Sequence, residues 1–200
     1  MNKLLLASSS ATRQKLIKEM GIPFDVIKQT AHEVVDAHLN LQQATTLIAQ
    51  RKMKHVVMPS SFEGTTAFVL TADSLERDSR GIIHCKPIDK SDAIKKLKLL
   101  RGQGIVGTAF CLDKKTYSNN RWSTIKRIER YVQSIYILEI PDDWIERYLE
   151  HVPHYLNITG GITIEGYGAQ FLTSINGSYS TILGLPVFEL REALEDIGFF

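Results

Sequence analysis

The sequence lacks the short motifs that mark the commonest metal and phosphate sites. It contains no CxxC pair, no HExxH and no Walker A pattern, which argues against zinc-ribbon, zincin and P-loop proteins. The histidines show no zinc-ligand spacing either, so a surface position is expected for each of them. They are His32, His38, His55, His84, His151 and His154.

Cysteine is scarce, and long apolar runs are missing. Cys85 and Cys111 each lie in an apolar, strand-like setting, so reduced, buried thiols of a cytoplasmic protein are expected rather than a disulfide framework. The apolar start at residues 4–7 is shorter than the roughly 7–15 residues of a signal-peptide core. No stretch approaches the about 18 apolar residues of a transmembrane helix, so no membrane association is expected.

Positive and negative charges nearly balance. The formal net charge is +2, from 24 Lys and Arg against 22 Asp and Glu, whereas nucleic-acid binders usually carry a concentrated basic stripe. The densest basic stretch, residues 114–130, lacks regular aromatic residues. We interpret it as a solvated hairpin or loop, with a phosphate-tracking surface as the less favoured alternative, and expect no nucleic acid polymer as a partner.

The chain is long enough for one large domain, or one domain with a lobe, around a sizeable core. Strand-like and helix-like segments alternate, which predicts an α/β or α+β fold. The expected strands are residues 4–7, 24–27, 66–71, 81–85, 104–112, 130–138, 162–164 and 170–175. The expected helices are one capped by Ser10 and ended by Gly21, then residues 41–57, 91–100 with Ser91 as cap, 142–149 and 186–197.

Two polar positions follow predicted strands. Ser8 to Ser10 lead into a helix that carries Arg13 one turn in, and a helix N-terminus with an arginine is suited to binding phosphate. The simpler alternative is a helix cap with a surface arginine. Asp73 follows an apolar strand at the edge where open α/β sheets hold ligands; a turn-forming aspartate is equally compatible with the spacing.

Further candidate residues are a glutamate, two lysines and a glycine-rich stretch. Lys52 follows an apolar helical face, Lys86 precedes a proline and so lies in an extended segment, and Glu33 lies in a polar loop. Residues 160–168 are dense in glycine, which permits unusual backbone angles, and hold Glu165 between a strand and a turn. A plain β-hairpin or bulge explains that stretch equally simply.

Several segments, read in order, resemble motifs of a known family. Residues 5–13, LLASSSATR, are similar to the opening LASxSPRR of the Maf, or septum-formation-inhibitor-like, proteins. Residues 21–24 read GIPF as in that family, and residues 48–53, IAQRKM, resemble its LAxxKA.

The resemblance continues to the end of the chain. Residues 72–74, ADS, resemble the family's ADT, and Lys86 with the following proline matches its KP. Residues 176–186, NGSYSTILGLP, resemble its GSYxNVVGLP. No single piece is specific, but their joint order and spacing are.

This resemblance implies a fold and an activity. The implied fold is one domain over residues 1–200, with an elongated mixed sheet flanked by helices, a nucleotide cleft between two lobes, and often a homodimer. The implied reaction is hydrolysis of a nucleoside triphosphate to the monophosphate and pyrophosphate, with Mg²⁺ or Mn²⁺. By matched position, Asp73 would be the general base and a metal contact, with Glu33 holding the metal or the attacking water. The triphosphate would be bound by Ser8, Arg13, Lys52 and Lys86.

The departures from the family pattern bear on the substrate. Ala11-Thr12 replaces Pro-Arg, and Ser74 replaces Thr; Thr12 and Ser74 remain candidate substrate contacts. In the family that this chain resembles, one branch is selective for uridine and thymidine triphosphates and carries Gln at the position of Glu165. A second branch is selective for 7-methylguanosine triphosphate and carries Glu there. Since a carboxylate only accepts hydrogen bonds, Glu165 suits a guanine edge better than uracil. However, that second branch has Trp at position 12, so the base stays open.

Two other functions are compatible with the same residues. One is a nucleotide-binding regulator of cell division with weak or no catalysis. The other is a phosphatase of small phosphoesters, which would release orthophosphate instead of pyrophosphate. Retention of Ser8, Arg13, Lys52, Asp73 and Lys86 favours catalysis, because a binding module has little need of a base.

Overall fold

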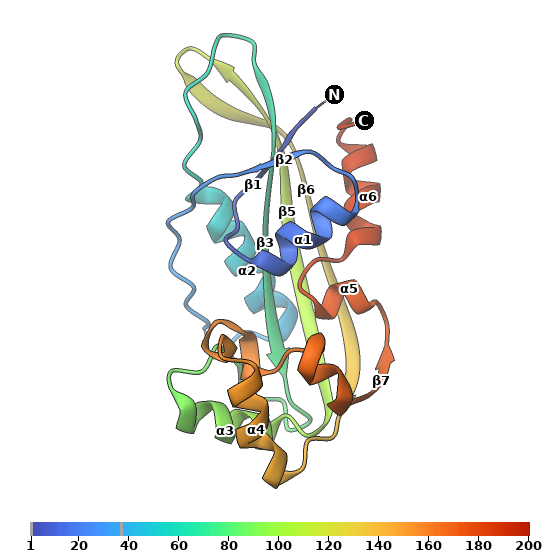
Figure 1. The fold of residues 1–200 in the computed structure, drawn as a ribbon. Helices are drawn as coiled ribbons and strands as arrows, with labels where there is room; N and C mark the ends of the chain where they lie inside the picture. The colour runs from blue at the N-terminus through green and yellow to red at the C-terminus, as the bar shows by residue number, and fades with distance from the viewer. Residues whose placement is uncertain (1, 37) are drawn as a thin grey trace. The chain divides into compact units, whose positions relative to one another are not determined.

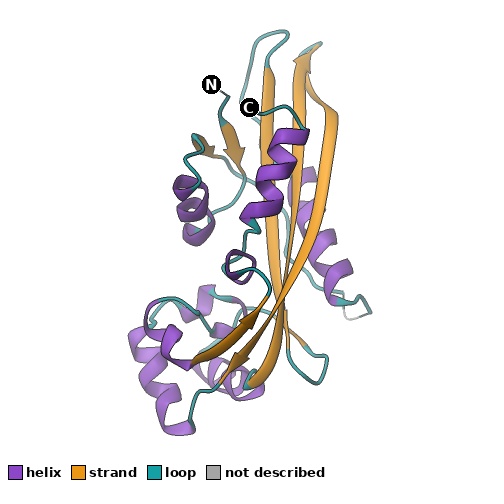
Figure 2. Ribbon diagram, turned by 90° about the vertical axis from the view of Figure 1, so that its right-hand side faces the viewer, coloured by secondary structure: helices purple, strands orange, loops and turns teal. Residues whose placement is uncertain are grey.

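The computed structural model describes residues 2–36 and 38–200. Its strands form one seven-stranded sheet in the order β2-β1-β3-β5-β6-β7, with β4 paired to β3. The sheet mixes parallel and antiparallel pairs and is flanked by helices (Figures 1 and 2), which confirms the predicted α/β class. Contacts divide the chain into two compact units. Unit 1 comprises Met1–Asp73, Thr108–Val132 and Gly184–Phe200, and unit 2 comprises Ser74–Gly107 and Gln133–Leu183.

Unit 1 begins with a strand-helix-strand motif. β1 (Leu4–Leu6) pairs in parallel with β2 (Phe24–Val26) and with β3 (Thr66–Arg77), and a parallel pair requires a crossover such as the helix α1 (Ala11–Glu19). The Ser10 hydroxyl caps α1 by accepting from the backbone N–H of Arg13 at 3.4 Å. The chain leaves α1 through Gly21, whose φ of 69° favours glycine. Both ends of this helix were predicted correctly.

Two more helices belong to unit 1. α2 (Leu41–Lys54) starts with a capping box between Asn40 and Gln43, and α6 (Val187–Asp196) closes the chain. α2 ends earlier than predicted, at the cap residue His55. The unit's apolar core takes side chains from strands and helices alike, among them Leu4, Leu6, Ile17, Ile48, Val69, Leu70 and Cys111.

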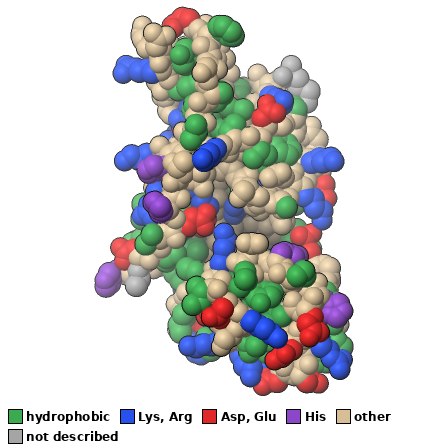
Figure 3. Space-filling model, turned by 60° about the vertical axis from the view of Figure 1, so that its left-hand side comes forward, with side chains coloured by type: hydrophobic (Ala, Val, Ile, Leu, Met, Phe, Trp, Pro, Cys, Tyr) green, Lys and Arg blue, Asp and Glu red, His purple; other side chains and the backbone are tan. Residues whose placement is uncertain are grey.

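The basic stretch forms the turn end of a long β-hairpin. β5 (Gly102–Ser118) and β6 (Arg121–Leu138) are neighbours in the sheet, joined through Asn119 and Asn120 with φ values of 52° and 59°, as a tight hairpin turn requires. The hairpin interpretation is confirmed, but the stretch is not wholly solvated. Arg127 donates two hydrogen bonds, of 2.6 and 2.8 Å, to the buried carboxylate of Asp113. On the face shown in Figure 3, basic and acidic side chains are interspersed.

Unit 2 packs short helices around its own core. Besides one end each of β3, β5 and β6, its elements are β4 (Ile83–His84), α3 (Lys90–Leu99), α4 (Asp142–His151), the 3₁₀ turns η1 (Tyr155–Asn157), η2 (Thr159–Gly161) and η3 (Gly166–Phe171), β7 (Leu172–Asn176) and α5 (Tyr179–Ile182). Its core includes Leu97, Leu100, Tyr136, Leu138, Tyr148 and Phe171.

Several expectations for unit 2 were wrong. Residues 162–164 form no strand, because the preceding Gly160 and Gly161 have φ of 67° and 79°, which turns the chain through η2. α3 is capped by Asp89, which accepts from the Asp92 N–H, and not by Ser91. Cys111 is buried as expected, but Cys85 is exposed; neither cysteine is part of a disulfide.

His84 is also not at the surface. It is 4% exposed, and its Nε2 lies 3.0 Å from Asp78 Oδ2, a buried partner that offsets the cost of removing the ring from water.

β3 is longer than expected. The prediction ended the strand at Ala72-Asp73, but the strand continues because Glu76 and Arg77 pair with His84 and Ile83 of β4. Asp73 therefore lies inside a strand and is neither a strand end nor a turn residue. Within residues 2–36 and 38–200, no helix combines the length and apolar character needed to cross a membrane.

Candidate functional site

The turn between β1 and α1 holds a buried arginine. Arg13 is 8% exposed; its Nε donates to the carbonyl oxygen of Gly184 at 2.7 Å, and its Nη1 donates to Ser8 Oγ at 3.4 Å. The alternative of a surface arginine is therefore wrong. Ser8 and Arg13 lie together as the phosphate-site prediction requires, and Thr12 is half-buried on the same first turn.

A lysine of α2 bridges two carboxylates in the same unit. Lys52 Nζ lies 2.7 Å from Asp73 Oδ1 on β3 and 2.7 Å from Glu33 Oε1 in the loop before α2. The side chains of Lys52 and Asp73 are 7% and 9% exposed, whereas that of Glu33 is 41% exposed. Three residues selected from separate parts of the sequence thus meet in one cluster.

The packing of α2 against β3 explains this meeting. Ile48, Ala49 and Lys52 share the buried face of α2, and Thr71 Oγ1 donates to the Ala49 carbonyl at 2.9 Å. Because side chains alternate along a strand, Asp73 lies on the same face of β3 as Thr71. That face presents the carboxylate to Lys52.

Burial and charge act against each other in this cluster. Burial raises the pKa of Asp73 above its usual range, although Lys52 and Arg13 pull it down. Burial likewise lowers the pKa of Arg13, against the attraction of Asp73 and Glu33. A partly desolvated carboxylate between two cations can bind, orient or accept a proton from a polar ligand.

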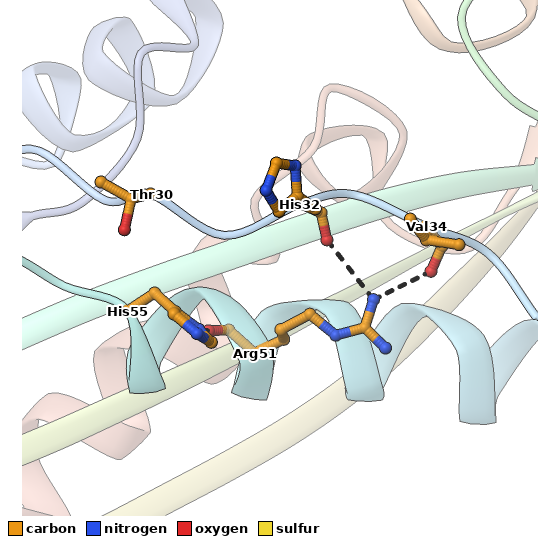
Figure 4. Close-up of a pocket in the computed structure, with 5 residues that line it drawn as sticks. All are labelled: Thr30, His32, Val34, Arg51 and His55. Carbon is orange, nitrogen blue, oxygen red and sulfur yellow. Dashed lines mark hydrogen bonds between the residues drawn. The ribbon is translucent and has the colours of Figure 1, made fainter.

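Arg51 holds the loop that carries Glu33. Its Nη1 donates to the carbonyls of His32 at 3.4 Å and Val34 at 3.0 Å, the residues on either side of Glu33 (Figure 4). The same residues, with Thr30 and His55, line a cavity of about 550 Å³. Arg51 was missed by sequence reasoning, and its position next to Lys52 was the available signal.

The other predicted site residues belong to unit 2. The Ser74 carbonyl accepts from Thr159 Oγ1 at 3.4 Å, and Lys86 is exposed, with its carbonyl accepting from Lys96. Glu165 is half-buried before η3, and its N–H donates to Thr163 Oγ1 at 3.2 Å. Their roles toward a substrate stay predictions.

Comparison with known proteins gives the family. The model of the Maf-like protein family matches residues 3–197. The chain belongs to the Maf family. Similar Maf proteins include one from Fusobacterium nucleatum, 32% identical across 98% of this chain and 96% of its own length, and one from Caldicellulosiruptor bescii, 28% identical across 100% and 96%. Both are named dTTP/UTP pyrophosphatase.

The oxygen donors of this Maf protein are compatible with a divalent metal. Among the residues that the structure describes, no three His, Cys, Asp or Glu side chains form a metal cage. Glu33 and Asp73 nevertheless both reach the same nitrogen of Lys52. Mg²⁺ commonly takes one or two carboxylates and completes its shell with water and substrate phosphate, so these two residues fit such an ion.

The Arg51 contacts give the first testable prediction for this Maf protein. Arg51→Gln should lose the hold on both carbonyls and leave Glu33 mobile. If the predicted role of Glu33 in turnover is right, kcat should fall by about tenfold or more, toward the roughly hundredfold that a misplacement of about 1 Å can cost. The melting temperature should change little because the side chain is partly exposed. Lys54→Gln, on an exposed position of the same helix, is the control. Equal kcat for both variants would contradict a positioning role.

Proposed function

We propose that this protein is a nucleoside triphosphate pyrophosphatase, which cleaves its substrate between the α- and β-phosphates and releases a nucleoside monophosphate and pyrophosphate. The observation that carries the proposal is the cluster of unit 1, in which Lys52 joins buried Asp73 to Glu33. Membership of the Maf family and the pyrophosphatase names of full-length relatives support it.

The cationic residues are suited to binding the phosphates. Attack on phosphorus increases the negative charge on its oxygens, so fixed cations stabilise the transition state. Arg13 is held by Gly184 and Ser8, and an arginine held in this way loses little freedom when it binds phosphate. Lys52 supplies a second charge, and Lys86 is proposed as a third contact with the triphosphate.

Asp73 is proposed as the general base. A base works best when its pKa is close to the operating pH, and burial moves the pKa of Asp73 upward in that direction. Its carboxylate would accept a proton from the attacking water, which Glu33 helps to orient. Mg²⁺ or Mn²⁺, held by Glu33 and Asp73, would neutralise phosphate charge and make water a better nucleophile.

The relatives and Glu165 point to different bases. The names of the relatives favour dTTP and UTP, whereas an acceptor-only carboxylate at position 165 suits the N–H groups of a guanine edge. We propose pyrimidine triphosphates as the first substrates to test. Thr12, Ser74 and Glu165 are the candidate residues through which the choice of base could differ.

A panel of nucleotides tests the function. The purified protein is incubated with Mg²⁺ or Mn²⁺ and with dTTP, UTP, GTP, 7-methylguanosine triphosphate and other triphosphates, and pyrophosphate and orthophosphate are measured separately. Pyrophosphate from one or a few of them is expected. No pyrophosphate from a folded protein would favour the nucleotide-binding regulator.

The role of Glu165 gives a second prediction. Glu165→Gln should shift relative kcat/KM from guanine toward pyrimidine nucleotides by about tenfold or more, because an amide both donates and accepts whereas a carboxylate only accepts. Glu150→Gln, at an exposed position of the same unit, is the control. An unchanged substrate profile would remove Glu165 from base recognition.

A further inference from the structure

Unit 2 contains a buried carboxyl group that the proposed chemistry does not use. Glu76 is 3% exposed on β3, three residues beyond Asp73 and on the opposite face of the strand. The hydroxyl of Tyr136, itself 2% exposed on β6, donates a hydrogen bond to Glu76 Oε1. Buried carboxyl groups are rare unless a specific contact holds them.

The second oxygen of Glu76 faces the turn η2. A Cβ atom at Gly160 would lie 2.0 Å from Glu76 Oε2 and 2.6 Å from Leu100 Cδ1, so only glycine fits between them. Gly160 also has a φ of 67°, which glycine adopts readily. Glu76 therefore packs directly against the backbone of the turn.

This turn is hydrogen-bonded to both stretches of chain that carry predicted site residues. Thr159 Oγ1 donates to the Ser74 carbonyl at 3.4 Å, and Gly160 N–H donates to the Cys85 carbonyl at 3.3 Å. Ser74 follows Asp73 in the chain, and Cys85 precedes Lys86. A shift of the turn would move backbone next to each of these residues.

We propose that Glu76 is a positioning residue: held by Tyr136, it supports the turn at Gly160 and thereby fixes the backbone beside Asp73 and Lys86. Its effect on turnover rests on the proposed pyrophosphatase function, whereas its structural role does not.

The surroundings of Glu76 favour its neutral form. The titratable groups facing it are Tyr136 of β6, Tyr148 of α4, Asp78 and the cross-strand neighbour His84, whose ring is paired with Asp78. Burial, with the charge of Asp78 in addition, raises the pKa of Glu76 to about 8, while the Tyr136 hydrogen bond acts in the opposite direction. A pKa near 8 makes the neutral form predominate at pH 7, and ionisation would place a charge against Gly160 and Leu100.

Thermal unfolding tests this role without any substrate. A raised folded-state pKa contributes stability that is complete below the ordinary value of 4.5 and is lost as pH rises toward 8. Glu76→Gln imitates the neutral acid. The difference in melting temperature between this variant and the wild type should therefore increase in favour of the variant from pH 5 to pH 8 and stay constant above pH 8. Glu150→Gln should run parallel to the wild type. Parallel curves for Glu76→Gln would overturn the proposal.

The pH profile of turnover tests the link to catalysis. At pH 7 Glu76→Gln should match the wild type, and by pH 9 its kcat/KM should exceed that of the wild type by about tenfold, since ionisation of Glu76 is then nearly complete. Tyr136→Phe should move the alkaline limb of the wild-type profile to higher pH, because the lost hydrogen bond had favoured the ionised form.

These outcomes separate the two proposals. A wild type that releases no pyrophosphate contradicts the pyrophosphatase function, while the melting curves still decide the role of Glu76. If Glu76→Gln does not fold, the Tyr136→Phe profile decides. An alkaline limb that is identical in wild type and Tyr136→Phe would then overturn the positioning role.

Discussion

Asp73→Asn should abolish turnover and leave the protein folded. An amide has nearly the same size and shape as the carboxylate, and its oxygen can still accept the 2.7 Å hydrogen bond from Lys52. It cannot act as a base, so kcat should fall by at least about a hundredfold, the usual contribution of general base catalysis. Circular dichroism and the melting temperature establish the fold, and pyrophosphate release measures the turnover.

The matched control for this variant is Asp25→Asn. Asp25 lies on β2 of the same unit, and its side chain is 54% exposed in an ion pair with Lys3, so the same chemical change there should leave kcat unaltered. If Asp73→Asn retains near-wild-type turnover, Asp73 is not the base, and another group must activate the water.

Lys52→Met should cause the largest loss of stability. It removes the ammonium group from the buried carboxylate of Asp73, and breaking a buried ion pair costs about 3–5 kcal/mol because the remaining charge is left uncompensated. For a chain of this size the lower value corresponds to a fall of roughly 6–12 °C in melting temperature. The loss should shrink at acidic pH, where Asp73 takes up a proton.

Two further variants separate this effect from a general effect on the helix. Lys54→Met changes an exposed lysine of α2 and should stay within about 0.5 kcal/mol of the wild type. The double variant Lys52→Met with Asp73→Asn should be less destabilised than the sum of the single changes, because neither charge remains. Additive losses would show that Lys52 and Asp73 do not stabilise each other.

Local patterns in the sequence predicted much of unit 1. Ser10 and Gly21 mark the two ends of α1, and the alternation of strands and helices gives the α/β class. Such features depend on neighbouring residues only, so a single sequence contains them. The comparison of whole motifs with the Maf family then selected Lys52 and Glu33, which composition and spacing alone did not.

Features that depend on distant parts of the chain were not predicted. The length of β3 follows from its pairing with β4. Burying the carboxylate of Asp73 inside this strand costs free energy, which the ion pair with Lys52 of α2 offsets. Glu76 is acceptable in the core only because Tyr136 and Gly160 surround it. His84 can be buried for a similar reason, because its ring nitrogen Nε2 forms a hydrogen bond with the carboxylate of Asp78. A sequence read locally assigns such groups to the surface.

The most direct test of the proposed function is to follow hydrolysis of dTTP and UTP by ³¹P NMR, with Mg²⁺ present and with Asp73→Asn as the blank. We expect one nucleoside monophosphate and one pyrophosphate for each triphosphate consumed, and no reaction in the blank. A nucleoside diphosphate with orthophosphate would instead show cleavage at the terminal phosphate and contradict the proposed pyrophosphatase.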